Sequence, residues 1–242
     1  HILSGVFEGV TTGTALHMII YNKDADPSAY EDIKQLYRPG HADFTYEKKY
    51  GIRDYRGSGR ASGRETAARV AAGAIARKIL SLRNVTVTAY TVKAAGIGCR
   101  NKDFSDINKN SMRAPDTQAA EEMLTCITKL ADQGNSAGGV VECTVTGLMP
   151  GLGEPVFDKL DAELAKAMLS IGAVKGIEFG AGFRCADMTG DEHNDQMSAE
   201  GFLTNNAGGI LGGISNGEDV IFRIAVKPTS SMRHPQLTID QN

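Results

Sequence analysis

The feature that most constrains this chain is an arginine-rich segment that runs directly into a long alanine-rich stretch. Arg38-Pro39-Gly40-His41 opens the segment, four more arginines follow by residue 64, and residues 67–80 are mostly alanine, valine and isoleucine. Apolar side chains on nearly every side of a helix are typical of a buried helix. The sequence therefore predicts an enclosed helix over residues 67–80, in which Gly73 lets a neighbouring backbone approach closely.

The start of this helix has the chemistry of an anion site. Ser62 and Glu65 have the spacing of a capping box, in which each side chain accepts from the other residue's backbone N–H. The open N–H groups and the positive end of the helix dipole favour an anion at such a turn, and Arg60 and Arg64 flank it. We expect the turn to bind a phosphate or a substrate with two anionic groups. The alternative is an ordinary core helix with solvated basic residues at its start.

Composition narrows the possible partners. The chain has 242 residues, is 41% hydrophobic and carries a net charge of −3, so it has no global basic field for nucleic acid or an anionic membrane. No apolar run approaches the roughly 20 residues that span a bilayer, and no signal peptide is visible. The four cysteines form no CxxC pair. We therefore expect a cytoplasmic protein with reduced thiols and with neither a membrane nor a nucleic-acid partner. Tyrosines among the basic residues leave single-stranded nucleic-acid binding as a minor alternative.

The order of predicted elements indicates an α+β fold. Apolar and polar residues alternate in most predicted strands, and short turns join them, which favours antiparallel sheets with helices between them over a doubly wound parallel sheet. Residues 98–115 are polar and mixed, and we expect an exposed excursion there. We predict two strands within 2–21, further strands at 85–92, 138–148, 173–179 and 219–226, and helices at 67–80, 116–133 and 156–170.

Most common site motifs are absent. The glycines at 57, 59 and 63 miss the dinucleotide-binding spacing, no P-loop is present, and the five histidines show no paired metal spacing, so we expect no metal. Three polar segments remain that suit phosphate: 38–64, 205–215 and 227–231. The second is alternatively a tight turn, and the third a polar strand end. Together they favour a large anionic ligand with more than one recognition point.

Four long segments carry a specific resemblance. They read RPGHADFTYEKKYGIRDYRGSGRASGRETAARVAAGAIA, GLGEPVFDKLDAELAKAMLSIGAVKGIEFGAGF, TNNAGGILGGIS and KPTSS, in that order. Their sequence closely resembles the chorismate synthase family, and the resemblance runs along essentially the whole chain. It implies one domain over residues 1–242 with a β-α-β sandwich, in which helices are layered between antiparallel sheets. It also implies a homotetramer whose flavin sites draw on neighbouring subunits.

The resemblance implies a lyase of the shikimate pathway, which makes precursors of the aromatic amino acids. In an anti-1,4-elimination, 5-enolpyruvylshikimate 3-phosphate loses phosphate and a ring hydrogen to give chorismate. The family requires reduced FMN although no net redox change occurs. Because no nicotinamide fingerprint is visible, we expect an external flavin reductase to supply it. The alternative is a catalytically silent module that binds flavin or phosphate and keeps only the fold.

The resemblance also assigns roles to individual residues. His41 matches a histidine beside flavin and substrate that is a proposed proton donor. Arg64 and Arg69 lie where the family's arginines meet substrate anions. The implied FMN contacts are Arg60, Ala61, Ser62, Gly172, Ala173, Gly212, Lys227, Pro228, Thr229, Ser230 and Ser231.

Some family features are not present in residues 1–242. The family's GESHG segment and arginine-rich loop, near its N-terminus, and its GRHDPC segment, near its C-terminus, are not found here. Ser58 and Gly63 stand where glycine and alanine are usual, and Gly172 stands for asparagine. We therefore expect residues 1–242 alone to bind flavin or substrate weakly and to have essentially no turnover.

Overall fold

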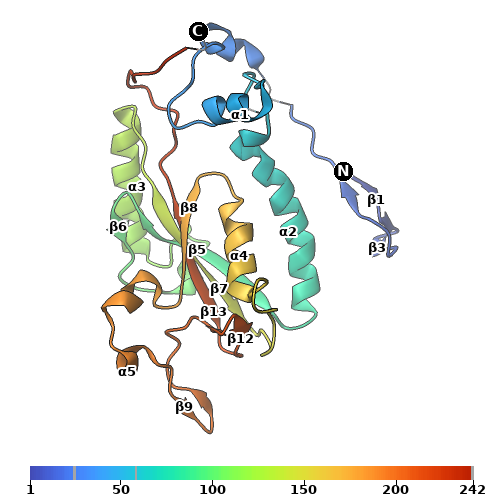
Figure 1. The fold of residues 1–242 in the computed structure, drawn as a ribbon, viewed down its shortest axis with the longest axis vertical. Helices are drawn as coiled ribbons and strands as arrows, with labels where there is room; N and C mark the ends of the chain where they lie inside the picture. Colours follow the sequence, from blue (N-terminus) through green and yellow to red (C-terminus); the bar gives the residue numbers. More distant parts are fainter. Residues whose placement is uncertain (24–25, 58, 241–242) are drawn as a thin grey trace. The chain divides into compact units, whose positions relative to one another are not determined.

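The computed structural model describes residues 1–23, 26–57 and 59–240, so that Ser58 lies outside the described residues. Internal contacts divide the chain into two compact units, His1–Lys78 with Pro235–Asn242, and Ile79–His234. Figure 1 shows the course of the chain through both. The expectation of a single domain stays a prediction.

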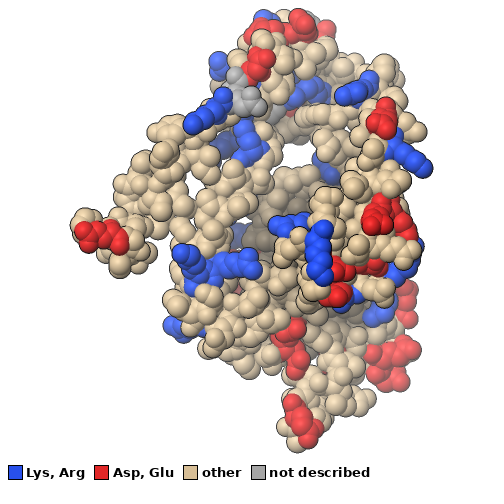
Figure 2. Space-filling view, turned by 180° about the vertical axis from the view of Figure 1, so that it is seen from behind, with Lys and Arg blue, Asp and Glu red and all other residues tan. Residues whose placement is uncertain are grey.

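Unit 1 begins with two small antiparallel ribbons, so that four short strands lie where we predicted two. β1 (Ile2–Ser4) pairs with β4 (His17–Met18), and β2 (Val6–Phe7) pairs with β3 (Val10–Thr11). Many apolar side chains of the ribbons face solvent; that of Phe7, for example, is 69% exposed. Figure 2 shows few charged side chains over this projecting segment.

The rest of unit 1 is mostly short helical turns before one long helix. In chain order these are η1 (Pro27–Ile33), α1 (Asp43–Tyr50), η2 (Gly59–Ala61), η3 (Gly63–Glu65) and α2 (Thr66–Ser81). The sequence analysis missed α1. The segment after residue 234 returns to this unit: Tyr37 N donates to Ile239 O at 3.1 Å, and Leu36 forms a bridge with Asp240.

Helix α2 exists where predicted, but the prediction that it is enclosed is wrong for this chain. None of its residues is buried, and Val70 is 72% exposed. A Cβ on Gly73 would meet nothing within 4 Å, so no neighbouring backbone approaches it. The physical reason is that alanine has the highest helix propensity of any residue. An alanine-rich run forms a helix whether or not another surface covers it.

Unit 2 contains a five-stranded sheet with the order β6-β5-β7-β13-β8, in which every neighbouring pair is antiparallel. This confirms the predicted α+β fold with antiparallel sheets. Its strands are β5 (Thr86–Ala94), β6 (Ile97–Gly98), β7 (Gly139–Thr146), β8 (Val174–Phe179) and β13 (Val220–Val226). Two hairpins, β9 (Met197–Ser198) with β10 (Gly201–Phe202) and β11 (Ile210–Leu211) with β12 (Ile214–Ser215), complete its strands.

The helices of unit 2 are α3 (Thr117–Asp132), α4 (Leu160–Leu169) and α5 (Gly190–His193), with 3-10 turns η4 (Phe104–Asp106) and η5 (Gly182–Asp187). Helix α4 begins four residues later than predicted because Glu154 and Asp158 pair across a tight turn. One face of the sheet packs against α4 around Cys143, Val220 and Phe222. Among the described residues, each helix is too short or too polar to span a bilayer.

Most of residues 98–115 are exposed, as we predicted, but the segment also has a buried part. Ile107 and Ala114 are buried, because side chains within the segment satisfy its backbone. The Asp116 carboxylate accepts from the N–H groups of Arg100 at 2.9 Å and Asn101 at 3.1 Å. The Asn110 side chain bonds both the carbonyl and the N–H of Ala114.

A polar row crosses the opposite face of the sheet through paired strand positions. Glu142 of β7 is 1% exposed and accepts from Tyr90 Oη, Lys102 Nζ and Arg223 Nε, each at 2.6 Å. Arg223 also reaches Glu178 of β8 at 3.1 Å. Burial opposes ionisation, but hydrogen bonds from Lys102 and Tyr90 outweigh it, so the pKa of Glu142 is lowered.

Replacing Glu142 with Gln should destabilise unit 2 by about 3 kcal/mol, because it leaves two cations without their buried counter-ion. Urea unfolding followed by circular dichroism measures this. Glu178→Gln is the matched control: Glu178 is 29% exposed, and its loss should cost about 1 kcal/mol or less.

The unfolding free energy lost in Glu142→Gln should decrease as the pH falls. Because the pKa of Glu142 is lowered on folding, its contribution is fully present above the unfolded value of about 4.3 and disappears as pH falls through the folded value. The stability difference between the unchanged protein and Glu142→Gln should therefore shrink below about pH 4. A difference that is constant from pH 7 to pH 3 would contradict the ionised pair.

Candidate active site

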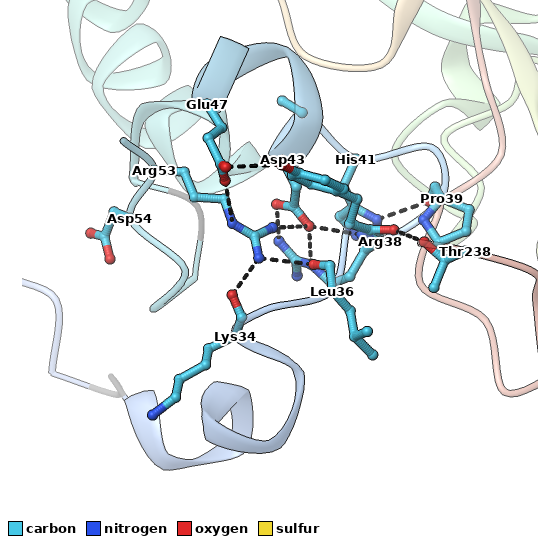
Figure 3. Close-up of polar contacts among 12 residues, drawn as sticks. Lys34, Leu36, Arg38, Pro39, His41, Asp43, Glu47, Arg53, Asp54 and Thr238 are labelled. Carbon is cyan, nitrogen blue, oxygen red and sulfur yellow. Dashed lines mark hydrogen bonds and ion pairs between the residues drawn. The ribbon is translucent and has the colours of Figure 1, made fainter. Parts of the chain in front are cut away.

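The His41 ring is held by the turn that precedes it. His41 N donates to Arg38 O at 3.2 Å, and Nδ1 lies 3.1 Å from the carbonyl oxygen of Pro39. Gly40 has a positive φ of 71°, which this tight turn requires and which glycine adopts without strain. Figure 3 shows the ring beside Pro39 and Arg38. His41 is half-buried.

The turn is anchored to a buried carboxylate at the start of α1. The Asp43 side chain is 4% exposed and accepts three bonds from Arg38: backbone N at 3.0 Å, Nε at 2.8 Å and a terminal nitrogen at 2.9 Å. Arg53 meets the same carboxylate at 3.0 Å. Burial opposes ionisation of Asp43, but the bonds from Arg38 and the charge of Arg53 outweigh it, so the pKa of Asp43 is lowered.

Arg53 contacts both this carboxylate and the backbone of residues 34–36. Its side chain is only 6% exposed. The guanidinium donates to the carbonyl oxygens of Lys34 and, at 2.8 Å, Leu36, and lies 5.3 Å from the Tyr37 ring centre. Figure 3 shows Arg53 among these partners, with Asp43 on its other side. Residues 34–43 therefore surround one buried arginine.

The arginine turn before α2 is only partly as predicted. Ser62 caps η3, since its hydroxyl accepts from Arg64 N at 3.4 Å. The capping box is incomplete: Ser62 N donates to Gly59 O, and the Glu65 carboxylate instead pairs with Arg69 at 3.1 Å. An ion pair at this spacing on a helix competes with the return bond of a capping box.

An open groove of about 910 Å³ lies beside this turn. Arg60 and Arg64 line it, and its apolar wall consists of ribbon and α2 side chains, namely Leu16, Met18, Ile20, Ala67, Ala68 and Ala71. A separate cavity of about 20 Å³ has Ala61 on one side and Ala42 and Asp43 on the other. The structure thus brings the predicted Arg60–Ser62 stretch next to the segment that follows His41.

Unit 2 brings two other predicted segments together. Lys227 N donates to Ala173 O at 2.9 Å, so Gly172 and Ala173 lie beside the Lys227–Ser231 segment. Ala173 has a φ of 71°, which is rare for a residue with a side chain and is common at functional sites. Ser136 Oγ donates to Thr229 O at 2.8 Å, and Lys227 Nζ bonds the Ser230 hydroxyl.

Gly212 lies elsewhere in the same unit. It forms the β11–β12 turn with Gly213, whose carbonyl accepts from Leu160 N at 2.8 Å, at the first residue of α4. Gly172 follows the other end of this helix. Ten residues of helix span about 15 Å, so Gly212 is not adjacent to the other predicted contacts of unit 2.

The glycine-rich segment 205–215, which we expected to suit phosphate, has several of its backbone N–H groups already bonded within the chain. The Asp195 carboxylate accepts from Asn206 N at 2.6 Å and Ala207 N at 2.8 Å, and Asn205 Oδ1 accepts from Gly209 N at 2.7 Å. The alternative interpretation, a tight turn, is therefore correct for residues 205–209. An internal carboxylate occupies the donors that a phosphate would need.

Sequence reasoning missed several residues that organise these sites. Asp43, Ser136 and Asp195 each act through partners that only the fold brings near, and none lies in a motif of its own. The one available signal was an acidic residue two positions after His41, at a helix start. Among the described residues, no group of three or more histidine, cysteine, aspartate or glutamate side chains is arranged to hold a metal.

Comparisons with known proteins agree along the whole chain. A family model described as chorismate synthase matches residues 1–242. The chorismate synthase of Syntrophobacter fumaroxidans is 54% identical over 239 residues, covering 99% of this chain and 68% of the relative. That of Desulfatibacillum aliphaticivorans is 53% identical, covering 99% and 67%. A crystal structure of chorismate synthase matches with a TM-score of 0.79 and 32% identity, covering 94% of this chain and 71% of the other.

The fold and these matches define a lyase with antiparallel sheets. The chain belongs to the chorismate synthase family, which acts in the shikimate pathway and uses reduced FMN.

Replacing Gly138 with Ala tests how the Lys227–Ser231 segment is held. An added Cβ would lie 2.7 Å from Val226 O and 3.2 Å from the Pro228 ring, so that segment must move. We expect a loss of about 1–3 kcal/mol in unfolding free energy. Gly172→Ala is the control, since its Cβ would meet nothing within 4 Å, and it should be close to neutral. Equal effects would show that crowding at Gly138 is unimportant.

Proposed function

We propose that this chain carries out the family reaction, the elimination of phosphate from 5-enolpyruvylshikimate 3-phosphate to give chorismate, with reduced FMN bound. The observation that carries the proposal is the His41 turn, fixed by a buried carboxylate, with the arginine turn at residues 59–65 next to it. A titratable ring and several guanidiniums are the groups that phosphate elimination requires.

The residues of unit 1 fit the cofactor. The apolar wall of the groove suits a flat aromatic ring system, and Arg60 and Arg64 suit its phosphate. When bound, reduced FMN would lend electron density to the allylic system as phosphate leaves. We propose that Arg60, Ala61 and Ser62 contact it from this unit.

We propose further FMN contacts in unit 2, at Gly172, Ala173, Gly212 and Lys227–Ser231. Lys227 and the hydroxyls of Thr229, Ser230 and Ser231 give this segment a cation and hydrogen-bond donors suited to an anion. We also propose a homotetramer. Because flavin sites in such an assembly draw on neighbouring subunits, the contacts from the two units need not come from the same copy.

The chain's own groups would act on the departing phosphate and on a proton. Arg64 and Arg69 would stabilise the negative charge that develops as the carbon–oxygen bond breaks. Arg69 is paired with Glu65, so substrate anions must compete with that carboxylate. His41 would donate a proton, which an imidazole can do near neutral pH.

Anaerobic mixing of residues 1–242 with reduced FMN and 5-enolpyruvylshikimate 3-phosphate tests the proposal. We expect measurable flavin binding with very little chorismate from these residues alone. A chimera that adds the flanking segments of the Syntrophobacter fumaroxidans relative should form chorismate, and His41→Ala in this chimera should lower turnover while flavin stays bound.

Each contrary outcome has a defined meaning. Chorismate at normal enzymatic rates from residues 1–242 would contradict the expected loss of turnover. Flavin binding by the chimera without product would support the silent binding module. Turnover unchanged by His41→Ala would remove this histidine from the mechanism.

Replacing Arg60 or Ser62 with Ala tests the arginine turn. Both changes should weaken FMN binding more than they lower the melting temperature, because Arg60 is exposed and the Ser62 cap is worth about 1 kcal/mol. Flavin fluorescence titration and thermal unfolding of the same samples measure the two effects. Equal losses of both would favour a turn that only starts the helix.

A further inference from the structure

We propose that Asp43 is the positioning residue of His41: its carboxylate fixes the turn so that the ring keeps its proton on Nδ1 and exchanges protons at Nε2. This inference rests on the proposed function, in which His41 donates a proton. It adds the atom that does so and the residue that selects it.

The turn is fixed at its first residue. Asp43 accepts from the backbone N–H of Arg38 and from two nitrogens of its guanidinium, so both the main chain and the side chain of residue 38 are held. His41 N then bonds Arg38 O at 3.2 Å and closes the four-residue turn. Figure 3 shows the Asp43 carboxylate with contacts to both guanidiniums.

The fixed turn selects one tautomer of the ring. Nδ1 lies 3.1 Å from Pro39 O, and a carbonyl oxygen can only accept a hydrogen bond. Nδ1 must therefore carry a proton when this bond is made. In the neutral ring the lone pair is then on Nε2, and this atom takes up and releases the second proton.

The negative charge of Asp43 is needed because two cations converge on it. Arg53 is almost fully buried and meets the carboxylate at 3.0 Å, and Arg38 meets it at 2.8 Å. Without a charge between them the guanidiniums would repel each other. Arg53 is also held by the Leu36 carbonyl and the Tyr37 ring, and Arg38 lies over the Tyr30 ring. Asp43 accepts from the backbone N–H of Arg38 as well, so the turn that begins at Arg38 is the part expected to move.

The experiment is to read the His41 tautomer directly, by nitrogen-15 NMR of the histidine rings in residues 1–242 at a pH where His41 is neutral. His41→Gln assigns the signal. The unchanged protein should show His41 with a protonated Nδ1 and an unprotonated Nε2. In Asp43→Asn, which keeps the size of the side chain and removes its charge, this single-tautomer pattern should be lost and Nε2–H should appear.

Asp54→Asn is the matched control, since Asp54 is a nearby aspartate whose ion pair with Arg56 is exposed. It should leave the His41 pattern unchanged. Asp43→Glu keeps the charge and should preserve more of the Nδ1–H form than Asp43→Asn. If Asp43→Asn does not fold, Arg38→Lys, which loses the two-pronged contact but keeps Asp43 with Arg53, should show a smaller shift of the same kind.

Two results would overturn the inference: Nε2–H as the main form in the unchanged protein, or an unchanged His41 pattern in a folded Asp43→Asn or Arg38→Lys variant. Neither result depends on flavin. FMN titration of the unchanged protein is done in parallel, and a failure to bind there would reject the proposed function and leave the tautomer result standing.

Discussion

Unit 1 depends on one buried carboxylate that is shared by two guanidiniums. Asp43 faces Arg38 on its own turn and Arg53 from beyond α1, so a single charge joins segments on both sides of the helix. Removing a carboxylate from such a site leaves uncompensated buried charge, which costs more than the pair itself contributes. The geometry of the His41 turn follows from this arrangement.

Unit 2 also has a buried carboxylate that is shared by two cations, on β7 of its sheet. Glu142 is enclosed and accepts from Lys102 and Arg223, which lie 40 and 81 residues away in sequence. It therefore connects the 98–115 segment with β7 and β13. Each unit thus has a buried carboxylate that binds two cations, which lie close in sequence in unit 1 and far away in unit 2.

Much of the fold could be predicted from the sequence, since strand alternation and helix signals are local properties. Strands β5, β7, β8 and β13 and helix α3 lie within a few residues of their predicted bounds, whereas the short edge strand β6 was not predicted. The burial of α2 could not be predicted, because alanine serves both helix propensity and packing. The sequence marks His41 through the motif that resembles the family's, and its role stays a prediction. Asp43, Ser136 and Asp195 were not predictable, because their partners are near only in the folded chain.

The position of Gly212 across α4 from Gly172 sets a length scale. Ten helical residues separate the two glycines by about 15 Å within a single unit. A helix is stiff over this length, so the distance between Gly172 and Gly212 is fixed. A ligand that touches both ends must itself be an extended molecule.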